Sequence, residues 1–355
     1  MKFLLLLNFF ANVLGEVNLR GSLSRYDHDS LNNNNIMYIS DEDFHWKEFS
    51  NFQDRFSRRY SDLQELETRF SIFRQNLIGI LFHNTDHTQN FTMGINQFAD
   101  LTPEEFKAQY LSSYTSGVGS FGCKSFTSSA SGAPSSIDWR SEGVVNPVRD
   151  QGQCGSCWAF STTSNAESVW AIFSGQLLDL SEEFLVDCAS GAGYYNMGCN
   201  GGNPDSAFKY MINNGQCSES SYPYKAGTTK TAETCQSCSP VPVHFSSCSD
   251  VKQNDQISLK GAVAKQPVTI AIEADTRYFQ SYSGGILDSL ECGQNLDHAV
   301  EIIGYGTENG IDYWNVRNSW GTSWGEEGYV RIKKSSSTND PGICGLAIEP
   351  SFLVV

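Results

Sequence analysis

Two stretches near the start of the chain carry apolar residues at helical spacing. In residues 41–61, aromatic side chains recur every three to five positions, which predicts an amphipathic helix. Residues 63–84 show a similar pattern and predict a second helix. A short strand is expected within residues 90–100. Residues 111–136 are rich in Ser and Gly and lack periodicity, so they are expected to form an exposed linker.

The pattern changes after residue 136, where Gly, Cys and Trp become frequent. A helix is predicted to begin near Cys157 and to end at Gly175, a residue type common at helix ends. The last third of the chain contains apolar runs rich in β-branched residues, which predict strands at residues 267–274, 298–306, 312–320 and 328–334. A helical half followed by a strand-rich half predicts a two-lobed protein of the α+β class.

The first residues have the features of a targeting segment. Residues 1–15 contain a lysine, an apolar run and then small residues, which is typical of a secretory signal peptide cleaved near Gly15. Its apolar run is too short for a membrane anchor, and no later run is long enough, so no membrane span is expected. The protein is therefore expected in the secretory pathway, in a lysosome or vacuole or outside the cell. A formal net charge of −16 argues against a nucleic-acid partner.

The cysteine count points to both disulfides and a thiol. Eleven cysteines in a secreted chain predict disulfides, and an odd number leaves at least one thiol over. Cys157 stands at a predicted helix start, where the partial positive charge favours a thiolate. His298 opens a predicted strand and can supply an imidazole, whereas His244 is better explained as a surface or packing residue. Asn318 can accept the second imidazole proton, and Trp320 can shield that hydrogen bond from water.

The stretch Cys154–Trp158 matches the pattern Cys-Gly-[Ser/Ala]-Cys-[Trp/Tyr]. With His298 and Asn318 in their contexts, the chain resembles the papain family of cysteine proteases over nearly its whole length after the signal. The resemblance implies a papain-like fold with a helical lobe, a β-barrel-like lobe and a cleft between them. It implies that Cys157 attacks the substrate carbonyl and that His298 transfers the proton. Asn318 would then orient His298, and Gln151 would stabilise the oxyanion.

The cysteine pairs and the candidate catalytic residues also allow other roles. The pairs Cys154/Cys157 and Cys235/Cys238 have the spacing of zinc clips. We favour disulfides in a secreted chain with this His and Asn context, and no metal or cofactor is expected. A thioredoxin-like pair would need a βαβ setting that the pattern lacks. The alternative function is an inactive papain-like homologue that binds or inhibits, although all four expected catalytic positions are filled.

Two motifs in the first third resemble the propeptide of cathepsin L-like proteases. The residues of the first motif are three or four positions apart, so they share one helix face. They are Glu65, Arg69, Phe73, Asn76, Ile80 and Asn84. The second motif comprises Gly94, Asn96, Phe98 and Asp100. The resemblance implies a zymogen with an inhibitory propeptide at residues 16–133, whose helical domain covers about residues 41–107, and a mature peptidase at residues 134–355. Asp100 is the first candidate for an acid-sensitive contact, and Tyr110–Tyr114 would lie nearest Cys157.

The resemblance also implies a disulfide scheme. The expected pairs are Cys154–Cys199, Cys292–Cys344, Cys188 with Cys235 or Cys238, and Cys217 with the remaining one of these two. Cys248 and the propeptide residue Cys123 would then stay outside the disulfides, as would Cys157. Asn90 lies in the only Asn-X-Ser/Thr sequon and is expected to carry a glycan.

By the same resemblance, Glu349 lies at the floor of the second specificity pocket, which holds the residue two before the scissile bond. The expected substrate-binding residues are Gly201, Gly202, Pro204, Ala271, Leu296, Asp297, Ala299, Trp320 and Glu349. Apolar walls favour Leu or Phe, and the carboxylate at the floor can also pair with Arg. The expected partners are protein and peptide substrates and the propeptide itself. An endopeptidase is favoured because no inserted loop of the kind used by exopeptidases is found, and a monomer is expected.

Overall fold

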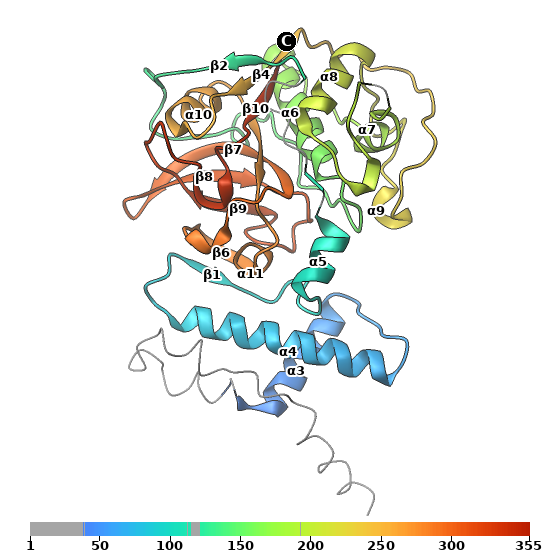
Figure 1. Cartoon of the computed structure of the whole chain (residues 1–355), viewed down its shortest axis with the longest axis vertical. Coiled ribbons are helices and arrows are strands. Elements are labelled where there is room, and N and C mark those ends of the chain that lie inside the picture. The colour runs from blue at the N-terminus through green and yellow to red at the C-terminus, as the bar shows by residue number, and fades with distance from the viewer. Residues whose placement is uncertain (1–37, 39, 112, 115–120, 192) are drawn as a thin grey trace, which may run out of the picture.

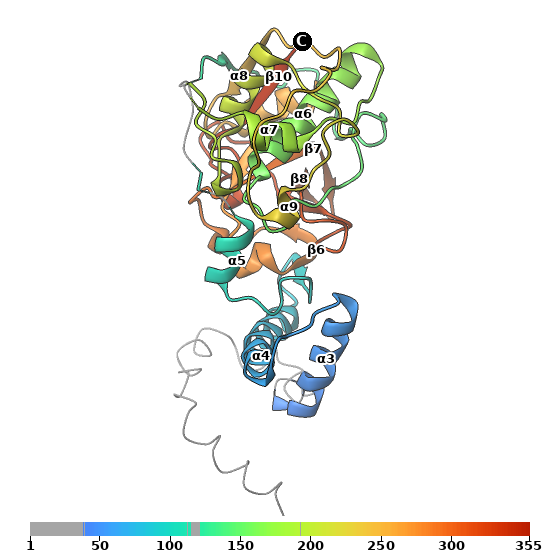
Figure 2. The ribbon, with the colours of Figure 1, turned by 90° about the vertical axis from the view of Figure 1, so that its right-hand side faces the viewer.

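The computed structural model describes residues 38–355 except residues 39, 112, 115–120 and 192. The C-terminal two thirds of the chain form a helical lobe beside a lobe built on a β-sheet (Figure 1). A smaller helical unit lies at one end of this body, as the view turned by 90° also shows (Figure 2). The expected signal peptide, residues 1–15, lies outside the described residues.

The N-terminal unit contains, within the described residues, α3 (Glu42–Arg55), α4 (Leu63–Thr85), β1 (Phe91–Met93) and α5 (Pro103–Tyr110). Its helices begin at polar caps, since the side chains of Asp41, Asp62 and Thr102 each accept a hydrogen bond from a first-turn amide. The predicted first helix is too long, because α3 ends at Arg55 and Ser57 turns the chain with a φ of 53°. The second predicted helix corresponds to α4.

The motif-bearing face of α4 holds the loop between β1 and α5. Arg69 donates to the carbonyl of Asp100 at 3.0 Å and to Glu105 Oε2 at 2.7 Å. Asn76 Nδ2 donates to the carbonyl of Ala99 at 2.8 Å. These bonds fix the loop that leads into α5, so the spacing of polar residues along α4 determines where α5 begins.

The helical lobe consists, in the described residues, of α6 (Cys157–Ser174), α7 (Glu182–Cys188), η3 (Gly198–Asn200), α8 (Pro204–Asn214) and α9 (Ala226–Thr229). As predicted, α6 begins at Cys157 and is capped by Gly175, which has a φ of 74°. It is buried on almost every side because it packs against α7, α8 and the sheet. This central helix therefore fixes the position of its first residue.

The second lobe is built on the sheet. The remaining elements are β2 (Lys124–Phe126), β3 (Ile137–Asp138), β4 (Ser247–Val251), α10 (Gln256–Val263), β5 (Val268–Ile272), α11 (Arg277–Gln280), β6 (Tyr282–Leu287), η4 (Leu290–Cys292), β7 (His298–Glu308), β8 (Ile311–Arg317), β9 (Tyr329–Lys333), η5 (Ile343–Gly345) and β10 (Ser351–Val354). The strand order is β1-β6-β9-β8-β7-β5-β10-β4-β2, with β3 beside β7. The four predicted strands are present as β5, β7, β8 and β9. Among the described strands the sheet has two free ends and does not close into a barrel.

The N-terminal unit is joined to the sheet lobe by backbone pairing and by a shared core. Strand β1 pairs antiparallel with β6, so the sheet continues from one unit into the other. Phe98 and Phe106 belong to the same buried cluster as Trp320 and Trp324 of the sheet lobe. The helices α3 and α4 have their own cluster around Phe49 and its neighbours. The helices α3 and α4 therefore have a core of their own, and the unit docks on the sheet lobe through β1, Phe98 and Phe106.

Ten of the eleven cysteines, all of which are described, form the disulfides Cys123–Cys248, Cys154–Cys199, Cys188–Cys235, Cys217–Cys238 and Cys292–Cys344. The expected pairs Cys154–Cys199 and Cys292–Cys344 are present. Of the two expected partners of Cys188, the structure has Cys235. Cys157 lies outside the disulfides. The expectation that Cys123 and Cys248 also stay outside them is wrong, because β2 brings Cys123 to the end of β4.

The predicted linker is also more structured than expected. Within residues 111–136, strand β2 pairs in parallel with β4, from Lys124 opposite Ser249 to Phe126 opposite Val251. A Ser/Gly-rich composition conceals this strand because only three residues pair. Among the described residues, no helix combines the length and apolar character needed to cross a membrane.

Candidate active site

Cys157 is the first residue of α6 and is fully buried. The cap residue Ser156 makes no side-chain hydrogen bond to the helix, so no side-chain cap offsets the partial positive charge of the helix start. The preceding loop is held by the Cys154–Cys199 disulfide and by a 2.9 Å bond from Gly155 N–H to the Cys199 carbonyl. The helix start acts in favour of a thiolate at Cys157, whereas the burial of this residue acts against a thiolate.

His298 and Asn318 form a buried hydrogen-bonded pair. His298 begins β7 and Asn318 directly follows β8, and these neighbouring strands bring His298 Nε2 to 2.8 Å from Asn318 Oδ1. The backbone N–H of Ser319 donates to the same oxygen at 2.7 Å. Because this oxygen accepts, Nε2 carries the imidazole proton and Nδ1 is the basic nitrogen. Within the described part of the chain, Nδ1 makes no hydrogen bond.

Trp320 covers this pair. Its ring stacks on the His298 ring with centroids 4.6 Å apart, and both side chains are buried. Burial lowers the pKa of His298 to about 4, and the hydrogen bond with Asn318 acts in the opposite direction. Phe98 and Phe106 of the N-terminal unit each pack edge-on against Trp320 at 5.3 Å. The N-terminal unit thus contributes to the dry surroundings that keep the imidazole neutral.

Gln151 is buried, and its amide orientation is fixed from both sides. Ser319 Oγ donates to Gln151 Oε1 at 2.6 Å. Gln151 Nε2 donates to the carbonyls of Cys154 and Tyr110, each at 2.9 Å. The sequence predicts that Gln151 Nε2 donates to the oxyanion. In the precursor this donor is instead bonded to the Tyr110 carbonyl of the N-terminal unit.

The chain after α5 runs along the expected site residues. Gly201, with a φ of 121°, lies so close to the backbone of Ser113 that an added Cβ would overlap it. Tyr114 Oη donates to Glu349 Oε2 at 2.8 Å. With the Tyr110 contact to Gln151, these contacts bring the predicted stretch Tyr110–Tyr114 against three of the expected site residues.

The expected residues of the second pocket come from several parts of the chain, and Glu349 among them bonds to Tyr114. Ala271 on β5 is the register partner of Ala299 on β7, and both are buried. Leu296 lies beside Gly345 and is half-buried. Glu349 is 7% exposed, which excludes a side chain that simply turns into solvent. The Tyr114 side chain is the described group that donates a hydrogen bond to Glu349.

The wall on the helical lobe combines glycine, proline and acidic residues. Gly202 leaves space for the ring of Trp158, and Pro204 begins α8. Burial, followed by the charge of Asp250, raises the pKa of the adjacent Asp205 to about 7. Sequence reasoning missed Asp205 and Asp250, because they come from an ordinary helix start and an ordinary strand.

A cation of the N-terminal unit lies against the acidic residues before β7. Lys107 Nζ on α5 is 2.6 Å from Asp275 Oδ2 and 3.7 Å from Asp297 Oδ2. Burial raises the pKa of Asp297 to about 7, and Lys107 acts against this rise. Asp100, the expected acid-sensitive residue, is buried inside the N-terminal unit and accepts from Tyr60 Oη at 2.9 Å. Asp275 and Asp297 are therefore the carboxylates that lie against Lys107 of the N-terminal unit.

The sequon residue Asn90 lies at the junction of the two units. It is exposed, and its Nδ2 donates to Asp288 Oδ2 at 2.7 Å. Its backbone carbonyl accepts from Ile286 N–H at 2.7 Å, next to the β1–β6 pairing. Exposure leaves room for a glycan on this side chain, although the amide already has a partner.

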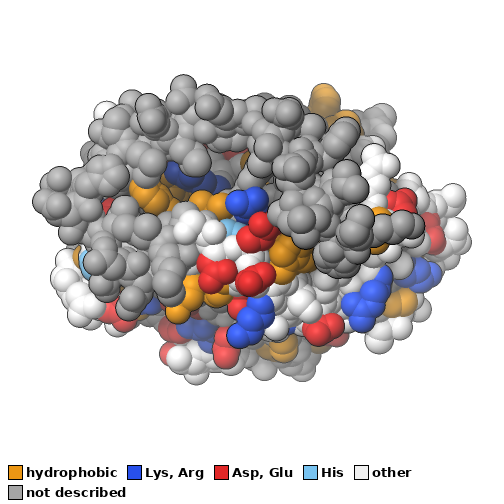
Figure 3. Space-filling view, turned by 90° about the horizontal axis from the view of Figure 1, so that it is seen from below, with side chains coloured by type: hydrophobic (Ala, Val, Ile, Leu, Met, Phe, Trp, Pro, Cys, Tyr) orange, Lys and Arg blue, Asp and Glu red, His pale blue; other side chains and the backbone are white. Residues whose placement is uncertain are grey.

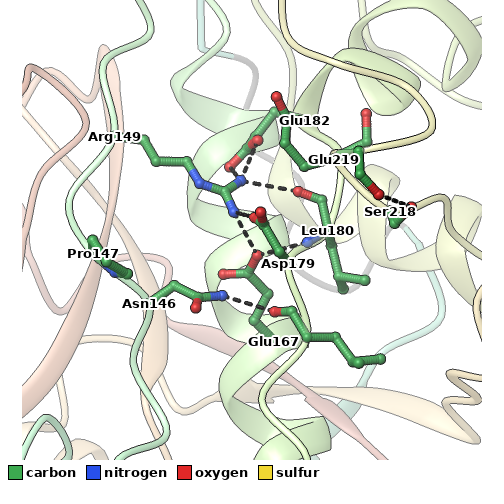
Figure 4. Close-up of polar contacts among 12 residues, drawn as sticks. Asn146, Pro147, Arg149, Glu167, Asp179, Leu180, Glu182, Ser218 and Glu219 are labelled. Carbon is green, nitrogen blue, oxygen red and sulfur yellow. Dashed lines mark hydrogen bonds and ion pairs between the residues drawn. The ribbon is translucent and has the colours of Figure 1, made fainter.

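A buried charge cluster surrounds Arg149, two residues before Gln151 (Figure 4). Its guanidinium bonds Glu167 on α6 at 3.0 Å, Glu182 at the start of α7 at 2.5 Å, and Asp179 between these helices. Burial raises the pKa of Glu167 and of Glu182, and Arg149 acts against burial at both. The cluster joins the segment that carries Gln151 to the helical lobe. Sequence reasoning missed it because no motif marks its members.

The surface seen from the N-terminal end shows no continuous basic area over the described residues (Figure 3). Lys and Arg side chains alternate there with Asp and Glu. One group of potential metal ligands, Cys123, Asp205 and Asp250, lies within 4.8 Å, but its sulfur belongs to a disulfide and cannot act as a thiolate.

Residues 133–354 match the family described as "Papain family cysteine protease", and residues 49–106 match "Cathepsin propeptide inhibitor domain (I29)". The chain belongs to the papain family of cysteine proteases. It is a papain-like cysteine protease with an N-terminal propeptide, of the cathepsin L-like type.

Similar proteins come from plants and animals. The chain is 40% identical to germination-specific cysteine protease 1 of Arabidopsis thaliana, covering 92% of this chain and 82% of that one. It is 45% identical to probable cysteine protease RD21B of the same plant, but spans only 61% of its length. Recombinant stem bromelain precursor superposes with a TM-score of 0.78, at 38% identity, over 88% of this chain and 99% of that one. Digestive procathepsin L 3 of Tenebrio molitor gives a TM-score of 0.77, at 37% identity, with the same coverage.

Proposed function

We propose that the chain is the precursor of a secreted cysteine endopeptidase that uses Cys157, His298, Asn318 and Gln151. The His298–Asn318 hydrogen bond under Trp320 carries this proposal, because it leaves Nδ1 as the basic nitrogen of the imidazole. Cys157 supplies the nucleophile at the start of α6. An imidazolium–thiolate pair forms when His298 takes the Cys157 proton.

The reaction follows from these positions. The thiolate sulfur bonds to the substrate carbonyl carbon, and the carbonyl oxygen becomes an oxyanion. Gln151 Nε2 and the backbone N–H of Cys157 donate to that oxygen, each bond being worth about 3 kcal/mol in the transition state. His298 then gives its proton to the leaving amine, and water attacks the thioester to restore the thiol. Asn318 keeps the imidazole in the correct tautomer throughout.

Active-site titration of the acid-processed protein with a thiol-directed epoxide tests this proposal. We expect inactivation by about one equivalent, with the label on Cys157. An inactive homologue, the alternative function, would show no hydrolysis of peptide reporters at any pH. Labelling without any prior hydrolysis would therefore support the alternative, and labelling of another residue would contradict the assignment.

The propeptide inhibits by covering this site in the precursor. Its Tyr110 carbonyl occupies the Gln151 donor, and its Tyr114 ring reaches Glu349. Its removal exposes His298 to water and so lifts part of the burial that depresses the pKa of the imidazole. We expect a precursor that is nearly inactive at neutral pH and matures at about pH 4–5, where paired carboxylates protonate.

Lys107 is expected to contribute to the pH at which the precursor activates. Lys107 attracts the charged form of Asp297, and this attraction is lost as Asp297 protonates in acid. Burial, which raises the pKa of Asp297 to about 7, acts in the opposite direction, because a carboxyl group whose pKa is raised in the precursor favours the precursor in acid. Lys107→Gln removes the attraction at every pH, so the precursor should activate at a pH about half a unit higher, as expected for loss of a surface ion pair.

The measurement is the rate of precursor processing from pH 4 to 7. Lys47→Gln, which changes an exposed lysine of α3, is the matched control and should leave the profile unchanged. A Lys107→Gln profile that coincides with wild type would show that this cation does not control release.

Glu349 is expected to determine whether the second pocket accepts Arg. A charged hydrogen bond is worth about 1.5–3 kcal/mol, which corresponds to about ten- to a hundredfold in rate. Glu349→Ala should therefore lower hydrolysis of Arg-Arg reporters about tenfold. We expect the lower end of the range because Asp205, a second carboxyl group, remains nearby. Phe-Arg reporters should change little, since the apolar walls are intact. Equal losses on both reporters would place Glu349 outside the pocket.

The remaining assignments concern the route to the mature enzyme. We propose a signal peptide at residues 1–15, propeptide removal near residues 133–136 and a monomeric product. Five disulfides favour passage through an oxidising compartment. Exposure of Asn90 supports glycosylation of the part to be removed. Delivery to a lysosome, a vacuole or the outside is compatible with all of these features.

A further inference from the structure

One disulfide joins the expected propeptide to the expected mature enzyme. Cys123 lies ten residues before Ala133, the last residue of the expected propeptide, and it is bonded to Cys248 on β4. Cys248 is 3% exposed and lies well inside the peptidase part of the chain. Cleavage near Ala133 adds water across a peptide bond and leaves this disulfide intact. Such cleavage therefore does not separate Cys123 from the peptidase.

The residues after Cys123 are also built into the sheet. Strand β2 pairs in parallel with β4 and forms one end of the strand order. The backbone N–H of Lys252 donates to the Phe126 carbonyl at 3.0 Å. Without β2, the edge of β4 would expose unpaired backbone groups. The strand thus completes the peptidase sheet and belongs to it structurally.

Side-chain contacts continue beyond the strand. Phe126 packs edge-on against Phe352 of β10, with ring centroids 5.3 Å apart. Ser128 N–H donates to Ser258 Oγ at 3.0 Å, and that hydroxyl donates back to the Ser128 carbonyl at 3.2 Å. An added Cβ at Gly261 on α10 would overlap the Ser128 side chain. These contacts join residues 126–128 to β10 and α10, away from the propeptide helices.

The residues that follow offer a site for cleavage. Residues 131, 132 and 134–136 are exposed, and residue 133 is partly exposed. Exposed segments without secondary structure are where proteases cut. Cleavage in this region leaves the β2 segment with a new carboxyl end, held by the disulfide and by the sheet.

We propose that the processed protease retains the β2 segment, residues 121–130, as a disulfide-tethered part of the active enzyme. This proposal rests on the proposed function only in that the precursor is processed. Cleavage both before Cys123 and after residue 130 gives a two-chain enzyme, whereas cleavage only before Cys123 gives a single chain that begins with the segment. In both forms the propeptide domain leaves and the strand stays.

The retained segment lies at the rim of the substrate site. The Cys123 sulfur is within 4.8 Å of carboxylate oxygens of Asp205 and Asp250, next to the pocket that contains Glu349. The Phe121 ring contacts that of the exposed Tyr195, at a centroid distance of 5.6 Å. The β2 segment therefore adds a wall to the peptidase beside the expected second pocket.

Mass spectrometry of the processed protein tests the proposal. The Cys157→Ala precursor is cleaved with added pepsin at pH 4, so the experiment does not depend on catalysis by this chain. Thiols are then blocked under denaturing conditions before any reduction. We expect Cys248 to escape blocking completely. In a two-chain product, reduction releases a peptide that contains Cys123, and in a single-chain product the N-terminus precedes Cys123.

The double variant Cys123→Ser/Cys248→Ser, made in the same Cys157→Ala background, is the control. Cleavage near Ala133 should then yield a non-reduced peptidase that is lighter by the mass of the lost segment after denaturation. A processed protein in which Cys248 is fully blocked before reduction and no peptide is released would overturn the proposal. Its failure would not affect the proposed catalytic residues, which the epoxide titration tests separately.

Discussion

Replacing Cys157 with alanine should abolish peptide hydrolysis while leaving the fold intact. Loss of a covalent nucleophile typically lowers kcat by about 10⁴- to 10⁶-fold. Cys157 makes no disulfide, so its removal deletes one buried sulfur and should cost about 1 kcal/mol of stability. Reporter-peptide hydrolysis after acid processing and a thermal melt of the precursor are the two measurements.

Two further variants make this test specific. Ser161→Ala changes a buried hydroxyl one turn further along α6, where it donates to the Trp158 carbonyl, and should stay within a few fold of wild type. Asn318→Ala should lose about a hundredfold and keep measurable activity, because Asn318 only orients the imidazole. Substantial hydrolysis by Cys157→Ala would end the catalytic assignment, whatever the other variants do.

Replacing Arg149 with methionine should destabilise the protein strongly, and increasingly so as the pH rises above neutrality. The substitution keeps the volume but leaves the buried carboxyl groups of Glu167 and Glu182 without their cation. Removing one partner of a buried ion pair costs about 3–5 kcal/mol. That loss corresponds to a fall in Tm of about 10 °C for a protein of this size.

The pH dependence follows from the direction of the pKa shifts. Burial raises the pKa of Glu182 to about 8 and also raises that of Glu167, even with Arg149 present. A carboxyl group with a raised folded pKa contributes stability fully below its unfolded pKa of about 4.5 and loses it as the pH rises through the folded value. Without Arg149 both shifts become larger. The variant should therefore melt close to wild type at pH 4 and far below it at pH 9, above the wild-type folded pKa of Glu182.

Arg140→Met is the matched control for this comparison. Arg140 pairs with Asp138 at 2.6 Å, but 41% of its side chain is exposed. Pairs of this kind contribute about 1 kcal/mol or less. Melts at pH 4 and 9 should therefore barely differ between Arg140→Met and wild type. An Arg149→Met deficit that is the same at both pH values would contradict the proposed role of the buried carboxyl groups.

Several features of the protein could be read from neighbouring residues in the chain. Periodicity and end signals within each element predict the limits of α6. They also predict α4 and the strands β5, β7, β8 and β9. The motif around Cys157 and the expected partners His298 and Asn318 were found in the same way. Local patterns suffice here because a helix or strand is stabilised first by the burial of one face of its own sequence.

The tertiary structure decided what depends on distant parts of the chain meeting. The choice of Cys235 for Cys188, and the unexpected Cys123–Cys248 bond, depend on the paths of long loops, which cysteine spacing does not encode. The three-residue strand β2 was missed because its stability comes from β4 and not from its own composition.

Charged groups show the same division most clearly. The sequence determined a net charge of −16 and the residue types of the candidate catalytic set. Only the fold surrounds Arg149 with carboxylates from α6 and α7, and only the fold brings Asp205 beside Glu349. A pKa depends on burial and on charges a few ångströms away, and both are properties of the packed chain, whereas the identity of a nucleophile and its helix start are already present in the sequence.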